Sequence, residues 1–214
     1  MEARASQSVW WPGLKNDIEQ KRAVCHSCIH AAPSQASLPP VLPPSPDFPM
    51  QQICSDIAFH GGHRYVVIVD RFTNWPSVYQ LKRTEGVIEA LRQHFVTFGA
   101  AEELSSDGGP EYVSTAMQEF LKRWGVSHRL SSAYHPHSNL RAELGVKVVK
   151  RMLRENQGPN GTLDTDRFAR ALLMYRNTPN KDLGVSPAQI LFGRCLKDHL
   201  PFAAEKRVGH SKVR

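Results

Sequence analysis

The sequence has few of the features that stabilise secreted proteins or anchor membrane proteins. It contains four cysteines among 214 residues, which is too few for a disulfide framework. No run of about 18 consecutive apolar residues occurs, so we expect no membrane-spanning helix. The N-terminal residues lack the basic stretch followed by an apolar stretch that marks a secretory signal. These absences predict a protein that stays inside the cell.

Acidic residues are outnumbered by basic ones. Asp and Glu total 20, Lys and Arg total 27, and the formal net charge is +7. A positive excess suits a polyanionic partner, because each phosphate that is neutralised releases condensed counterions. Charge alone does not separate a DNA-binding protein from an ordinary basic protein. Hydrophobic residues make up 41% of the chain, which is enough for a packed core and argues against general disorder.

Proline is concentrated in one segment. Residues 31–49 contain seven prolines and can form neither a helix nor an inner strand, so we expect an extended linker. The segment before it, residues 1–30, contains Cys25 and Cys28. Their spacing is typical of half of a metal site. The sequence therefore predicts a small N-terminal module that is joined by a linker to the rest of the chain.

A globular pattern extends over residues 50–202 and is followed by a basic tail, residues 203–214. Hydrophobic periodicity and the positions of glycine and proline predict alternating strands and helices. The expected strands are 51–59, 63–70, 76–81, 103–106 and 126–130, and the expected helices are 84–98, 113–124, 140–156, 166–177 and 187–192. This order predicts an α/β fold with a mixed five-stranded sheet and helices on both faces, as in ribonuclease H-like folds.

Three acidic residues are candidates for a metal site. Asp56 lies within the first expected strand, Asp107 follows the fourth, and Glu143 lies in the first turn of the long helix. Hard divalent ions such as Mg²⁺ prefer carboxylate oxygens, and a pair of such ions can drive phosphodiester transfer. Spacing alone leaves alternatives open, because Asp70 competes with the first acid and Glu111 with the third.

The residues around these acids carry a family resemblance. Four ordered segments contribute to it: HRYVVIVDRFTNWP, SSDGGPEY, SSAYHPHSN followed by RAE, and YRNTPNKDLGVSPAQILFGR. From about residue 50 to 202 the chain resembles the integrase core of gypsy-type long-terminal-repeat retrotransposons, within the retroviral integrase family. The resemblance assigns Asp56, Asp107 and Glu143 to the Asp-Asp-Glu triad, and it gives Asp70 a structural role.

The resemblance implies a function as well as a fold. It implies DNA integration by a polynucleotidyl transferase that uses Mg²⁺ or Mn²⁺ for 3′-end processing and strand transfer. Such an enzyme works on DNA in the nucleus as a homo-oligomer, because two DNA ends must be joined together. A catalytically inactive or host-adopted core that still binds DNA or a protein partner is the main alternative, and a nuclease of ribonuclease H type is a third.

The long helix is expected to face DNA on one side. Projected at about 100° per residue, Glu143 shares one arc with four cations, which could hold phosphates without reading sequence. The preceding loop belongs to the part of the family's core that touches nucleic acid. The candidate DNA-binding residues are Tyr134, His135, Lys147, Lys150, Arg151 and Arg154. The residues expected to pack against the core are Leu144, Val146, Val148, Val149, Met152 and Leu153.

Some positions depart from the family pattern. Cys25 and Cys28 match the second half of its His-His-Cys-Cys zinc module, but the two histidines would lie upstream of the first residue. We therefore expect a partial module that binds no zinc. His137 stands where the family has Gln, and Leu140 stands where it has Gly. The chain is also too short for the family's C-terminal barrel, so the resemblance predicts a truncated copy.

Overall fold

The computed structural model describes residues 5, 9–25, 46–81, 86–130, 140–158, 161–180 and 183–198, with the side chains of 140–143 excepted. The chain divides into two compact units. One unit is Pro39–Phe168 and the other combines Met1–Leu38 with Ala169–Arg214. In the part of the chain that is described, no helix is long and apolar enough to cross a membrane.

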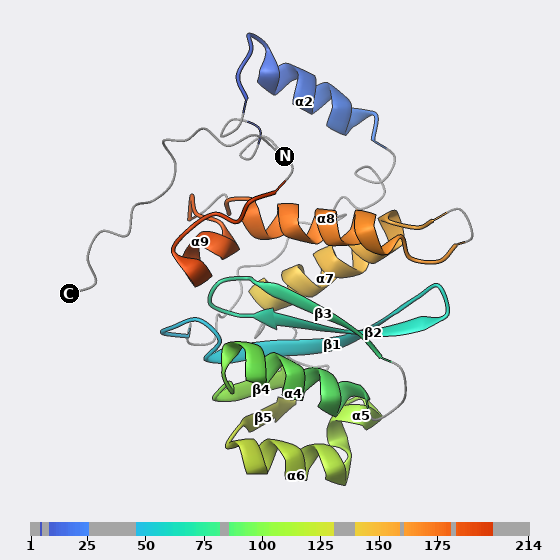
Figure 1. The fold of residues 1–214 in the computed structure, drawn as a ribbon, viewed down its shortest axis with the longest axis vertical. Coiled ribbons are helices and arrows are strands. Elements are labelled where there is room, and N and C mark those ends of the chain that lie inside the picture. Colours follow the sequence, from blue (N-terminus) through green and yellow to red (C-terminus); the bar gives the residue numbers. More distant parts are fainter. Residues whose placement is uncertain are drawn as a thin grey trace, which may run out of the picture. The chain divides into compact units, whose positions relative to one another are not determined.

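The larger unit is built on a five-stranded mixed sheet with the strand order β3-β2-β1-β4-β5 (Figure 1). The first three strands form an antiparallel meander, whereas β4 and β5 run parallel to β1. This is the ribonuclease H-like arrangement that the order of elements predicts. The strands are β1 (Gln52–His60), β2 (His63–Asp70), β3 (Pro76–Leu81), β4 (Glu103–Ser106) and β5 (Ser127–Leu130).

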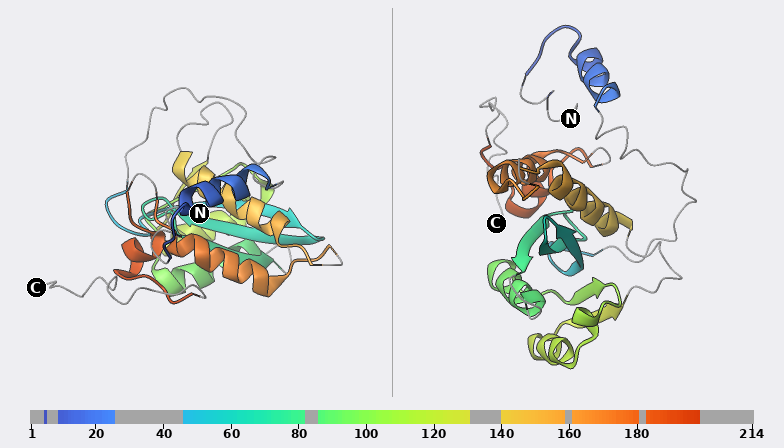
Figure 2. Two further views of the ribbon diagram at one scale, coloured as in Figure 1. Left: turned by 90° about the horizontal axis from the view of Figure 1, so that it is seen from above. Right: turned by 90° about the vertical axis from the view of Figure 1, so that its right-hand side faces the viewer.

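Helices cover both faces of this sheet (Figure 2). Helix α7 (Leu140–Glu155) packs on β1, β2 and β3. On the other face, α4 (Gly86–Phe98) packs on β3 and α6 (Thr115–Trp124) packs on β5. The expectation of a two-faced sheet is confirmed, and the central strands are correspondingly buried on both sides.

The expected helix 113–124 is wrong at its start. The structure has a short helix, α5 (Pro110–Val113), then a break at Ser114, and then α6. Ser114 is extended, with φ −62° and ψ 147°, and its hydroxyl accepts a hydrogen bond from the Met117 amide. Serine is a preferred N-cap because its hydroxyl satisfies an amide that has no partner within the helix. The cap therefore starts a new helix where apolar periodicity alone suggested a continuous one.

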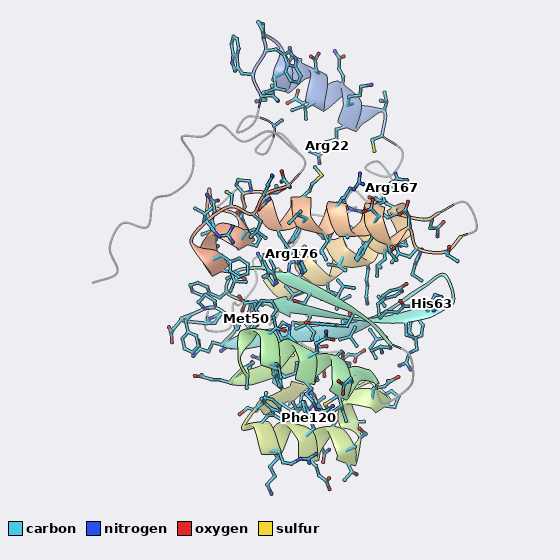
Figure 3. All side chains as sticks on the ribbon, viewed as in Figure 1. Arg22, Met50, His63, Phe120, Arg167 and Arg176 are labelled. Carbon is cyan, nitrogen blue, oxygen red and sulfur yellow. The ribbon has the colours of Figure 1, made fainter. Side chains whose placement is uncertain are left out.

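The core of the larger unit lies on both sides of β2. Residues Val66–Val69 are fully buried, which explains why this strand reads as a continuous apolar run. Below the sheet, the rings of Phe95 and Phe120 stack with centroids 5.9 Å apart, and Trp124 packs against both (Figure 3). This aromatic cluster joins α4 to α6 and holds the layer beneath the sheet together.

The second unit contains α2 (Leu14–Ala23), most of α8 (Thr165–Asn177) and α9 (Pro187–Phe192). Helix α9 begins and ends where its sequence predicts. Ser186 forms a reciprocal capping box with Gln189, Pro187 occupies the first turn, and Gly193 ends the helix in a left-handed conformation. These are the residues that physical chemistry favours at each position.

Candidate nucleic-acid-processing site

Asp56 lies in the middle of β1 on the face covered by α7. It pairs with Val67 of β2, and opposite residues of an antiparallel pair point to the same face. Its side chain is about one-third exposed, at 32%, and Oδ2 accepts a hydrogen bond of 2.8 Å from Nζ of Lys150 on α7. The strand thus presents an acid at the interface between sheet and helix, where both solvent and a cation reach it.

Asp107 follows the last residue of β4, the strand that runs parallel to β1. The last pair of their register is Ser55 with Ser106, so each aspartate directly follows one member of that pair, on neighbouring strands roughly 4.8 Å apart. Asp107 is exposed, and its Oδ1 accepts a hydrogen bond of 3.2 Å from the Gly109 amide. The register therefore brings together two acids that are far apart in the sequence.

Glu143 lies in the first turn of α7, on the face of the sheet that carries Asp56. Its side chain is outside the described residues. Seven residues make about two helical turns, so position 143 shares one stripe of the helix with Lys150.

The close approach of α7 to the sheet depends on Gly145, since a Cβ there would lie 2.8 Å from Cγ1 of Val69. This agrees with a packing role for this glycine.

The candidate cations of α7 have different surroundings. Lys147 and Arg154 are exposed. Lys150 contacts Asp56, and Nε of Arg151 lies 3.6 Å from Glu155 in the same helix. The predicted basic face is therefore present along the helix, but two of its four cations already face a carboxylate.

The predicted packing face of α7 is wrong at one residue. Leu144 is 51% exposed. The buried arc of the helix contains Val146, Val149, Met152 and Leu153, and at about 100° per residue Leu144 projects away from its centre. Val148 is half-buried, at the edge of that arc. The apolar surface of the helix is thus wider than the surface that packs.

Two hydrogen bonds support the acids from the opposite face of the sheet. Ser55 precedes Asp56, and its Oγ lies 2.6 Å from the hydroxyl of Tyr112 on α5. Ser106 precedes Asp107, and its Oγ lies 2.9 Å from Nε2 of His128 on β5. Burial raises the pKa of Tyr112 and lowers that of His128, so burial favours the neutral form of each side chain.

The two competing acids have other partners. Asp70 is fully buried, and its carboxylate accepts hydrogen bonds from the amides of Met50, Phe72 and Thr73 and from the Thr73 hydroxyl. A carboxylate that accepts so many hydrogen bonds holds the turn after β2 together rather than binding a metal ion. Glu111 forms an ion pair with Arg64 of β2.

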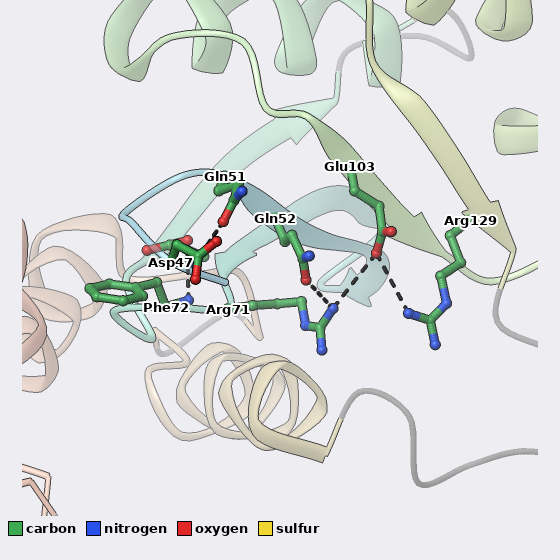
Figure 4. Close-up of polar contacts among 8 residues, drawn as sticks. Asp47, Gln51, Gln52, Arg71, Phe72, Glu103 and Arg129 are labelled. Atoms are coloured by element: carbon green, nitrogen blue, oxygen red, sulfur yellow. Dashed lines mark hydrogen bonds and ion pairs between the residues drawn. The ribbon is translucent and has the colours of Figure 1, made fainter. Parts of the chain in front are cut away.

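A separate polar network ties the strands together at the start of β1. Arg71 donates a hydrogen bond to Gln52 and lies 3.6 Å from Glu103 of β4, which is also 3.6 Å from Arg129 of β5 (Figure 4). Gln52 is four residues before Asp56, which corresponds to about 13 Å along a strand. This network therefore supports the pairing of the strands and lies away from the acids.

Several predicted site residues are outside the described part of the chain. They include Tyr134 and His135 of the loop, and Cys28 of the partial zinc module. His137, which departs from the family pattern, is also outside the described part. Cys25 is half-buried and follows α2. Among the described residues, no three His, Cys, Asp or Glu side chains gather in a way that could hold a metal ion. The roles of all these residues stay predictions.

Comparison with known proteins shows which domain family this part of the chain is similar to. Residues 46–136 match the integrase core domain family. The matched residues include both Asp56 and Asp107, whereas Glu143 follows them. An uncharacterized protein of Caenorhabditis elegans, K02A2.6, is 31% identical over 205 residues, which are 92% of this chain and 16% of that protein. The Pol polyprotein of Feline endogenous virus ECE1 is 32% identical over 139 residues, which are 63% of this chain and 13% of the polyprotein.

Solved integrase structures share the fold. The simian T-cell lymphotropic virus intasome in complex with PP2A regulatory subunit B56 gamma matches with a TM-score of 0.62 and 21% identity, covering 92% of this chain and 72% of that one. The HTLV-2 integrase catalytic core domain in complex with magnesium, in a trimeric form, matches with a TM-score of 0.52 and 20% identity, covering 68% and 98%. These likenesses confirm the ribonuclease H-like fold that the sequence predicts. The chain spans less than one-fifth of the two curated relatives' length.

Proposed function

We propose that this chain is the catalytic core of a retroelement integrase, which transfers DNA phosphodiester bonds with Mg²⁺ or Mn²⁺ held by Asp56, Asp107 and Glu143. The single observation that supports this most strongly is the parallel register of β1 and β4, whose last pair, Ser55 and Ser106, directly precedes the two aspartates within the segment that matches the integrase core domain.

The side chains at this position suit a divalent cation. Carboxylate oxygens are the ligands that Mg²⁺ and Mn²⁺ prefer, and Asp56 already accepts a hydrogen bond from an ammonium group, which indicates that the carboxylate attracts positive charge. Two divalent ions bound there would activate the attacking oxygen and stabilise the leaving oxygen of the phosphodiester. Glu143 would complete the set from the first turn of α7.

The cations of α7 would position the substrate. Lys147 and Arg154 are exposed on the helix that carries Glu143. Such side chains hold phosphates and fix the orientation of a duplex without selecting its sequence. Tyr134 and His135 of the preceding loop would contact the DNA end. These residues would bind and position the DNA, whereas the acidic residues would serve the reaction itself.

The source and setting of the enzyme belong to the same proposal. The four sequence motifs support an origin in a gypsy-type retrotransposon, and joining two DNA ends calls for a homo-oligomer that acts in the nucleus. The HTLV-2 integrase core, which shares the fold, has been solved in trimeric and dimeric forms. Because this chain spans a small part of its relatives' length, we assign to it only the core reaction.

A strand-exchange assay tests the proposal. A branched DNA that places a free 3′-hydroxyl beside a phosphodiester removes any dependence on the terminal sequence of the element. We expect exchange with Mg²⁺ or Mn²⁺ and none with a chelator. Asp56→Asn, Asp107→Asn and Glu143→Gln should each lower the rate at least about 100-fold, because each removes a negative charge that would hold the metal ions.

Glu119→Gln is the matched control. Glu119 is exposed on α6, so the same chemical change there should leave the rate unaltered, with circular dichroism verifying that every variant is folded. Full activity of Glu143→Gln would refute the proposed triad. Cutting of strands without any joining would instead identify a nuclease, and a chain that binds DNA but no divalent ion would be an inactive core.

A further inference from the structure

Lys150 connects the DNA-facing helix directly to the first acid of the site. Its Nζ lies 2.8 Å from Oδ2 of Asp56, although 94 residues separate the two in the sequence. The side chains are 36% and 32% exposed, respectively. The contact is therefore an ion pair at the rim of the interface between α7 and the sheet, and water can reach both partners.

The other cations of α7 are placed differently. Lys147, one turn earlier, is exposed, and Arg151 lies near Glu155 of its own helix. Among the described side chains of α7, Lys150 is thus the basic residue that forms an ion pair with an acidic residue of a strand. Lys147 carries the same charge on the same helix, which makes it a natural comparison.

A lysine and a divalent ion would compete for the same carboxylate. Both need the lone pairs of Asp56, and at about 4 Å two positive charges repel each other strongly at a partly buried site. An ion that binds Asp56 must therefore displace the ammonium group or share the carboxylate at a cost. Once displaced, Lys150 would still lie on the helix that carries the other basic residues.

We propose that Lys150 is an exchangeable counter-ion of Asp56, which competes with the divalent cation for this carboxylate and is released when the cation binds. The inference rests on the proposed function, since it takes Asp56 as a metal ligand. It adds that the affinity of the site for metal is set partly by a basic residue that the sequence alone would assign to DNA.

Removal of the Lys150 ammonium group should change the metal affinity only modestly. Ion pairs with this degree of exposure contribute little, and removal of the competitor should tighten metal binding by about two- to fivefold at low ionic strength. The effect should shrink as salt is added, because the pair is partly screened. Mn²⁺ binding can be followed through the electron paramagnetic resonance signal of the free ion, without any enzymatic turnover.

Three variants define the first test. Lys150→Gln should lower the Kd for Mn²⁺, whereas Lys150→Arg, which keeps the charge, should stay close to the wild type. Lys147→Gln removes one charge from the same helix and should also leave the Kd near its original value. An unchanged or raised Kd in Lys150→Gln, or an equal decrease in Lys147→Gln, would overturn the proposal.

The first part of the second test needs no metal and so separates the ion pair from the proposed function. Labelling of lysine amines, read by mass spectrometry, should be slow at Lys150 in the wild type and faster in Asp56→Asn, with Lys147 unchanged. Adding Mn²⁺ to the wild type should accelerate labelling of Lys150 alone. Equal labelling of Lys150 in both proteins would disprove the pair, whereas a confirmed pair without any Mn²⁺ binding would disprove the metal site.

Discussion

Each aspartate of the site is preceded by a serine that points to the opposite face of the sheet. Ser55 and Tyr112 are both almost fully buried, and their hydroxyl oxygens lie 2.6 Å apart. A buried hydroxyl that loses its partner is destabilising, because its interactions with water are not replaced. The bond therefore holds the middle of β1 to α5 directly behind Asp56.

Removing one hydroxyl of this pair should destabilise the protein. We expect Tyr112→Phe to lower the free energy of unfolding by about 1–3 kcal/mol, because it leaves the Ser55 hydroxyl buried without this partner. Ser55→Ala should have a similar effect on Tyr112. Urea denaturation followed by circular dichroism measures both changes.

The double variant provides the control. With both hydroxyls absent, no buried polar group is left unsatisfied by the change, so the two effects should not add. We expect the double variant to be more stable than the sum of the single changes predicts, by about 1 kcal/mol or more. Additive effects would show that the two hydroxyls do not interact.

At this scale the sequence singles out the acids but not their surroundings. Asp56 and Asp107 stand out because recognisable motifs surround them, and their role stays a prediction. The hydrogen bonds of Asp70 agree with the structural role that the resemblance gives it. The partners of Ser55 and Asp56 were not predicted. Tyr112 and Lys150 lie 57 and 94 residues away from them, and only the register of the sheet and the packing of α7 determine that these side chains meet.

The position of α7 depends on a residue without a side chain. Gly145 is buried in the helix, and a Cβ there would lie 2.8 Å from Cγ1 and 3.3 Å from Cγ2 of Val69. Val69 is fully buried in β2, and a β-branched side chain has few alternative rotamers. The strand cannot yield easily, so an added methyl group must push the helix outward.

We expect Gly145→Ala to be destabilising although alanine favours helices. The better helix propensity should contribute about 1 kcal/mol, and overpacking of a tight interface costs about 1–3 kcal/mol. The net change in the free energy of unfolding should be a loss of about 1 kcal/mol in urea denaturation. The same displacement should move position 143, and with it the third acid, away from the sheet.

In a second protein background, the effect of Gly145→Ala on stability should have the opposite sign. In a Val69→Ala protein the obstructing methyl groups are gone, so adding Gly145→Ala should stabilise that protein by about 1 kcal/mol through helix propensity. If Gly145→Ala were stabilising in the wild type too, close packing would not be the reason for this glycine.

Whole elements were predictable where local rules act alone. The bounds of β2, β3, β4 and α9 agree with the sequence, because apolar runs, turn residues and caps determine them locally. The break at Ser114 was missed, since the apolar spacing of α6 runs on through it. The exposure of Leu144 was missed for a related reason, because periodicity does not reveal how wide an arc of α7 the sheet covers.

At the scale of the whole molecule, the positive charge should govern affinity for DNA. The net charge is +7, and each phosphate that is neutralised adds about −0.9 to the slope of log affinity against log salt. Lys147 and Arg154 are exposed and available to phosphates, whereas Lys150 is paired with Asp56. The number of phosphate contacts should therefore depend on whether a divalent ion has released Lys150.

This dependence can be measured with a duplex that lacks 3′-hydroxyls and so cannot be joined. Without divalent ions, Lys150→Gln should bind it with the salt slope of the wild type. With Mn²⁺ present, the wild-type slope should be steeper than that of Lys150→Gln by about one unit, because one more phosphate is contacted. Lys147→Gln should lose about one unit of slope in both conditions.

Binding of metal and DNA would then be coupled in both directions, since linkage requires that each ligand strengthen the other. A slope difference at Lys150 that is the same with and without Mn²⁺ would contradict this coupling.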